Sequence, residues 1–87
     1  MTSQFESSTL TLDALPQGST AVVEGLEGAS AIEQRLRDLG LVPGTVVRVL
    51  RRAPLGDPTE YELRGYRLCL RRSEAARVRV RNKADPA

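Results

Sequence analysis

The side chains that carry catalysis in most enzymes are scarce in this chain. Histidine is absent from all 87 residues, which removes the usual general base and the commonest metal ligand. The serines have no base to activate them. Neither the phosphate-binding G-x-x-x-x-G-K pattern nor the dinucleotide-binding G-x-G-x-x-G pattern occurs. We therefore expect a protein that is not an enzyme and has no intrinsic cofactor.

Side chains that bind metals are present, but their spacing does not describe a site. Cys69 is the single cysteine, so an internal disulfide is excluded and no C-x-x-C pair exists. Its simplest interpretation is a small side chain on a strand face. The candidate ligands are Cys69, Asp57, Glu60 and Glu62. The sequence predicts no preformed metal site among them, although the exposed carboxylates could collect a weakly bound divalent ion such as Fe2+ or Zn2+ at a crystal or dimer contact.

Charge is distributed unevenly along the chain. Residues 1–34 contain five acidic residues and no basic one (net −5), whereas residues 35–87 hold all 13 Lys and Arg against six acidic residues (net +7). This asymmetry suggests a basic face with an acidic partner, or arginines on solvated strand faces. Phosphate contacts to nucleic acid would come from Arg67, Arg71, Arg77, Arg79 and Arg81. Surface aromatic residues on which bases could stack are missing, because Phe5 lies in a tail and Tyr61 and Tyr66 are expected to point inward.

The clearest local pattern lies in residues 30–44 and predicts a helix followed by a tight turn. Ser30 and Glu33 form an S-x-x-E capping box at the helix start. Gly40 is placed for a left-handed helix end, and Leu41 is placed to fold back onto the helix. The following V-P-G-T is typical of a type II turn. An apolar stripe at helical spacing is formed by Ile32, Leu36 and Leu39.

In the rest of the chain, apolar and polar residues alternate with the period of two that is typical of strands. Short strands are expected at residues 19–26, 45–52, 59–64, 66–71 and 77–81. A turn at 12–15 supplies leucines to one end of the core, and a single helical turn is expected at 73–76. The predicted fold class is mostly β, a small barrel of about five strands with one short inserted α-helix. The domain spans residues 9–81, with flexible tails at 1–8 and 82–87.

No apolar run approaches the ~20 residues that a membrane-spanning helix needs. The first residues also lack the basic and apolar regions of a secretory signal. We therefore expect a cytoplasmic protein.

The loop at residues 53–58 is the most informative exposed segment. It contains two prolines and a glycine, and Leu55 lies between Pro54 and Gly56. A lone apolar residue on a rigid loop is suited to docking a partner, although it could equally fold back over an edge of the barrel. Both interpretations are open at this point.

Three segments resemble the FeoA family of small accessory proteins of bacterial ferrous iron uptake. They are L-R-D-L-G-L-V-P-G at 36–44, R-A-P-L-G-D-P at 52–58 and G-Y-R-L-C-L-R at 65–71. The resemblance runs from about residue 10 to residue 80. Position 69 departs from it, because a small residue such as alanine is expected there. Similar domains also occur at the C-terminus of metal-dependent repressors, but we expect a free-standing domain here, without preceding DNA-binding helices.

The resemblance implies an SH3-like barrel that binds the cytoplasmic GTP-binding part of the membrane transporter FeoB and modulates it. It implies a partner-binding region formed by Leu39, Leu41, Pro43, Ala53, Pro54, Leu55, Gly56, Asp57 and Pro58. The helix face and turn around that region add Leu36, Gly40 and Gly44. Contact with the membrane is expected only through the transporter, and exposed strand edges suggest a homodimer. The alternative functions are a basic small-barrel module that binds nucleic acid and a metal-sensing regulatory domain.

Overall fold

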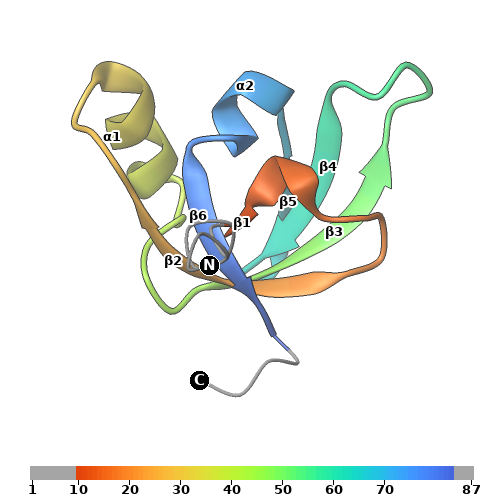
Figure 1. Cartoon of the computed structure of the whole chain (residues 1–87), viewed down its shortest axis with the longest axis horizontal. Helices are drawn as coiled ribbons and strands as arrows, with labels where there is room; N and C mark the ends of the chain where they lie inside the picture. The colour runs from red at the N-terminus through yellow and green to blue at the C-terminus, as the bar shows by residue number, and fades with distance from the viewer. Residues whose placement is uncertain (1–9, 84–87) are drawn as a thin grey trace, which may run out of the picture.

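The structure, a computed structural model, describes residues 10–83 of the chain (Figure 1). Its elements are β1 (Leu10–Thr11), the 3-10 helix η2 (Leu12–Ala14), β2 (Thr20–Leu26), α1 (Ala31–Asp38), β3 (Val46–Arg52), β4 (Thr59–Leu63), β5 (Tyr66–Leu70), α2 (Arg72–Ala75) and β6 (Val78–Asn82). The predicted tail at 1–8 and residues 84–87 of the second tail lie outside the described residues. The predicted start of the second tail at residue 82 is wrong, because Asn82 ends β6. No helix within 10–83 is long and apolar enough to cross a membrane.

One antiparallel sheet contains all six strands, in the order β1-β6-β2-β3-β4-β5. The last strand of the chain therefore lies between the first two. The mostly β class with one inserted helix is confirmed. The closed barrel of about five strands is not what the described residues form, because β1 and β5 are opposite edges of an open sheet. The extra strand, β1, is only two residues long and pairs with β6, so it does not reach the other edge.

Within residues 10–83 the buried core is aliphatic apart from Tyr61. The inward positions predicted for β3, β4 and β6 are confirmed, as is the role of the leucines of η2 in covering the core. The buried apolar side chains are Leu12, Leu15, Ala21, Val23, Leu36, Leu41, Val47, Val49, Tyr61, Leu63, Leu70, Ala75, Val78 and Val80. Because η2 also contacts α2, these two short helices cover one end of the core.

Two inward predictions are wrong. Ile32 and Tyr66 are each 39% exposed. Helix α1 turns Glu33 and Leu36 toward the sheet instead of Ile32, since Glu33 is bonded to Arg77, the residue before β6. Tyr66 lies on the edge strand β5, where its hydroxyl donates to the Leu39 carbonyl rather than entering the core.

The helix end and the turn after it have the predicted geometry. The Leu41 amide donates to the Leu36 carbonyl at 3.1 Å and the Gly40 amide donates to Arg37 at 2.9 Å, which is the Schellman pattern. Gly40 has φ +108°, a conformation that favours glycine. In the following turn the Thr45 amide donates to the Val42 carbonyl at 3.1 Å, as a type II turn requires. Helix α1 is thus fixed at its C-terminal end before β3 begins.

A buried carboxylate fixes the other end of α1. Glu33 is 4% exposed and accepts the Ser30 amide at 3.0 Å, completing the predicted capping box. It also accepts the Ser30 hydroxyl and a guanidinium N–H of Arg77. The Ser30 hydroxyl, followed by Arg77, lowers the pKa of Glu33 from its ordinary value of 4.5 to about 2. The carboxylate links α1 to β6 across 44 residues of sequence.

The lowered pKa of Glu33 predicts a specific acid sensitivity. Because the folded state binds this proton less readily than the unfolded state, the stabilisation is complete above pH 4.5 and is lost as the pH falls toward about 2. Chemical denaturation between pH 2 and pH 7 measures this loss. Glu33→Gln should flatten the fall in unfolding free energy below pH 4.5.

Glu27→Gln is the matched control. Glu27 also lies beside an arginine, with Arg79 Nε at 3.4 Å, but its side chain is 80% exposed whereas Glu33 is buried. This variant should keep the wild-type dependence on pH. An unchanged acid limb in Glu33→Gln would contradict the role assigned to Glu33.

Candidate protein-interaction site

The loop at residues 53–58 projects from the sheet between β3 and β4. The Ala53 amide donates to the Pro58 carbonyl at 3.0 Å and the Gly56 amide donates to the Ala53 carbonyl at 2.7 Å, so the loop is internally bonded. Leu55 at its tip is 96% exposed. Of the two interpretations left open by the sequence, the structure therefore excludes a leucine folded back over the edge of the sheet.

The base of this loop is held by Arg52. Its guanidinium donates to the Leu15 carbonyl at 2.7 Å and to the Thr59 hydroxyl at 3.1 Å. Its backbone amide donates to the Gln17 side chain at 2.9 Å. Both ends of the loop are thereby tied to the segment between η2 and β2 and to the start of β4. Arg52 is consequently occupied in supporting the loop.

The far side of the loop is held by α2. An Asp57 carboxylate oxygen accepts the backbone amide of Arg72 at 2.9 Å, at the first residue of the helix. Glu74 in turn accepts the Arg71 amide at 2.9 Å and a guanidinium N–H of Arg35 from α1. Helix α1, helix α2 and the loop form a continuous chain of contacts along one side of the molecule, the upper side in Figure 1.

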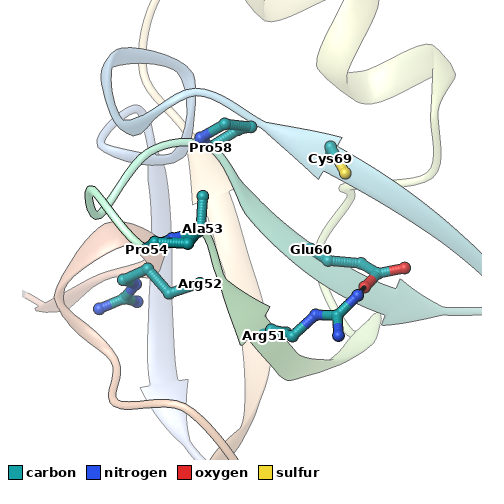
Figure 2. Close-up of a pocket in the computed structure, with 7 residues that line it drawn as sticks. All are labelled: Arg51, Arg52, Ala53, Pro54, Pro58, Glu60 and Cys69. Atoms are coloured by element: carbon teal, nitrogen blue, oxygen red, sulfur yellow. Dashed lines mark ion pairs between the residues drawn. The ribbon is translucent and has the colours of Figure 1, made fainter.

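A shallow groove of about 430 Å³ lies beside the loop, between it and the outer face of the sheet. Figure 2 shows its lining, which comprises Arg51, Arg52, Ala53, Pro54, Pro58, Glu60 and Cys69. The apolar part comes from the alanine and the prolines. Glu60 carries the acidic charge and lies 4.0 Å from Arg51 and 3.9 Å from Arg67. The groove therefore offers an apolar wall and an already paired carboxylate.

The remaining predicted contact residues do not join this loop in one patch. Leu41 is fully buried, so it contributes to the core and cannot meet a partner from there. Leu39 is half-buried, and its carbonyl accepts the Tyr66 hydroxyl near the β4–β5 turn. Pro43 is exposed in the type II turn. The loop and Leu39 lie at opposite ends of β4, about 13 Å apart along the strand.

The candidate metal ligands are not gathered into a site. Within residues 10–83, no three histidine, cysteine, aspartate or glutamate side chains are close enough to hold a metal ion. Cys69 is exposed and lies opposite Glu60 in the β4–β5 pairing. Asp57 is engaged by the amide of Arg72, and Glu62 lies 3.9 Å from Arg48. The glutamates in this region lie beside arginines, and Asp57 accepts a backbone amide.

The arginines proposed for phosphate contacts are mostly paired inside the protein. Arg67 lies 3.9 Å from Glu60, Arg79 lies 3.4 Å from Glu27, Arg81 lies 3.9 Å from Glu24, and Arg77 is bonded to Glu33. Three of these carboxylates come from the acidic first third of the chain. Acidic residues of the first third of the chain thus neutralise the arginines at 77–81, which weakens the case for a nucleic-acid surface there.

Sequence reasoning missed the supports of the loop. Arg35, Arg72 and Glu74 hold it through contacts between elements, and nothing in the local pattern points to these partners. The one available signal was Glu74 itself, at the third position of the short helix, where a glutamate typically receives the amide that precedes the helix.

Comparison with known proteins identifies one consistent set of relatives. The family model described as FeoA domain matches residues 10–82. An Fe(2+) transport protein A/Fe(2+) transporter FeoB fusion protein of Porphyromonas gingivalis is 36% identical over 69 residues, which are 79% of this chain and 8% of that protein. The chain therefore spans less than a tenth of that relative.

Two solved structures share the fold. A FeoA-like protein of Clostridium acetobutylicum is 32% identical, with a TM-score of 0.83 over 92% of this chain and 93% of the other. The FeoA of Stenotrophomonas maltophilia, crystallised with zinc, is 41% identical, with a TM-score of 0.75 over 83% of this chain and 89% of the other. The latter is described as an SH3 domain protein, which agrees with the SH3-like class expected from the sequence.

The bond between Asp57 and α2 predicts that one side chain fixes the position of the loop. Asp57→Ala removes the acceptor of the Arg72 amide, so that amide should exchange with solvent faster and the free energy of unfolding should fall by about 1 kcal/mol. Asp57→Asn keeps an acceptor oxygen and should restore most of the protection. Equal exchange rates of the Arg72 amide in wild type and Asp57→Ala would contradict this role.

Proposed function

Since this chain belongs to the FeoA family, we propose that it is an accessory protein of ferrous iron transport that acts by binding an FeoB-type transporter. In the P. gingivalis relative, a transport protein A segment and FeoB form one polypeptide, which supports an association between the two. The surface proposed for contact is the loop at 53–58, and the part proposed to receive it is the cytoplasmic GTP-binding domain of the transporter.

The observation that carries this proposal is the exposure of Leu55. A leucine that is 96% exposed gains nothing from the fold in which it lies, so its side chain is fully available to be buried against a partner. Burying one leucine side chain contributes about 1.5–3 kcal/mol, which corresponds to roughly a tenfold to hundredfold change in affinity. The loop is suited to this task because its bonds hold Leu55 in place before binding.

The groove beside the loop extends the proposed contact. Pro54 and Pro58 form an apolar wall next to Leu55, and Arg51 and Glu60 form a polar rim. An apolar centre with a polar rim is the usual arrangement of a protein-binding surface. The role needs binding alone, in agreement with a chain in which histidine is absent.

Replacing Leu55 tests the proposal directly. Leu55→Asp should leave the unfolding temperature unchanged, because the side chain is exposed, and should weaken binding to the purified GTP-binding domain of the transporter by at least tenfold. Titration calorimetry with wild type and variant provides the comparison.

Ile32→Asp is the control, because it introduces the same charge at a partly exposed apolar residue on α1, outside the loop. It should bind like wild type. Folded wild-type protein that fails to bind at high micromolar concentration would refute the transporter as partner. Wild-type affinity in Leu55→Asp would instead refute the loop as the contact.

A further inference from the structure

The strand β5 is an open edge of the sheet. Within residues 10–83 it pairs with β4 on one side and with no strand on the other. Five residues, Tyr66–Leu70, are long enough to receive another strand. An unpaired edge presents backbone donors and acceptors to any extended chain, so the side chains of β5 determine which kind of chain can bind there.

The turn before β5 shows which backbone groups face outward. Arg64 and Gly65 form a two-residue hairpin with φ +52° and +83°, typical of a type I′ turn. The residues that flank such a turn, Leu63 and Tyr66, exchange hydrogen bonds, and so does every second pair after them. The backbone groups of the intervening Arg67 and Cys69 therefore point away from β4, toward the open edge.

The inward face of β5 is incompletely covered. On the neighbouring β4, the inward side chains of Tyr61 and Leu63 are each 1% exposed. On β5, Tyr66 is 39% exposed and Leu68 is half-buried, although they lie on the same face as the buried Leu70. The apolar side chains of the edge strand β5 are thus only partly covered, and one more strand beside β5 would cover them.

The charge of this edge selects the kind of chain that it would accept. Residues 64–72 contain four arginines, Arg64, Arg67, Arg71 and Arg72, and no acidic residue. The Arg67 side chain is 70% exposed even though Glu60 lies 3.9 Å away. A second copy of β5 would bring four arginines against four, which is unfavourable, whereas an acidic chain would be attracted.

From these observations we infer that β5 is a strand-addition site for an extended segment of a partner protein in which apolar and acidic residues alternate. The apolar side chains cover Tyr66 and Leu68, the acidic ones face Arg67 and its neighbours, and the backbone pairs with Arg67 and Cys69. This surface is separate from the Leu55 loop, and the inference does not depend on the transporter being the partner.

Hydrogen exchange measured by NMR tests the inference on the backbone itself. The probe is a seven-residue peptide of alternating glutamate and valine, acetylated and amidated, and the control is the same peptide with lysine in place of glutamate. Saturating acidic peptide should slow exchange of the Arg67 and Cys69 amides at least tenfold and leave the Leu68 amide, which faces β4, unchanged. The lysine peptide should have no effect.

A pair of variants at one position separates backbone pairing from side-chain contact. Cys69→Pro removes the outward amide without removing a bond to β4 and should abolish binding of the acidic peptide. Cys69→Ala keeps the amide and should bind like wild type. If Cys69→Pro does not fold, the double variant Arg67→Glu, Arg71→Glu should lose at least tenfold in affinity instead.

Four results would overturn the inference. Two concern the peptides: unchanged exchange of the Arg67 and Cys69 amides with millimolar acidic peptide, or binding of the lysine peptide as tight as that of the acidic peptide. The other two are equal binding of the acidic peptide by Cys69→Pro and Cys69→Ala, and slowed exchange of both amides in concentrated protein without peptide. The last result would assign the edge to a second copy of this chain. None of these measurements involves Leu55, so they are independent of the test of transporter binding.

Discussion

The return of the last strand to a place between β1 and β2 is the contact on which the rest of this structure depends. Pairing with β2 buries Val78 and Val80 in the core, and pairing with β1 holds the first strand in the sheet. The same strand and the residue before it bring Arg77, Arg79 and Arg81 to carboxylates from the first third of the chain. Hydrophobic burial and charge pairing therefore favour the same register.

The loop that carries Leu55 depends on this arrangement through α2. That helix lies between β5 and β6 in the chain, and its short length leaves it little stability of its own. It is held by Arg35 from α1 at Glu74 and by Asp57 at the amide of Arg72. Since α1 is itself joined to β6 by the Glu33–Arg77 contact, the position of the loop follows from the pairing of β6.

The parts of the fold that could be predicted from the sequence are those governed by neighbours along the chain. The capping box at Ser30, the helix end at Gly40 and the alternation in β3 and β4 each depend on a few consecutive residues. Ile32 and Tyr66 could not be placed, because the side of α1 that faces the sheet is chosen by Arg77, and the cover over β5 depends on whether the sheet closes. The loop around Leu55 was predictable, whereas the exposure of Leu55 itself and the supports from Arg52 and Asp57 were not.

The open sheet offers two surfaces that would bind a partner by different interactions, the loop at 53–58 and the edge strand β5. The loop offers one apolar side chain held in place by hydrogen bonds at its base, so a contact there depends on shape and on the burial of a few atoms. The edge strand offers backbone groups and a half-covered apolar face, so a contact there depends on an extended chain of suitable charge. Because β4 runs from the loop to the β4–β5 turn and pairs with β5, one strand connects the two surfaces. A partner that presents an apolar pocket and an acidic strand would then engage both without any change in this fold, and the two affinities would reinforce one another.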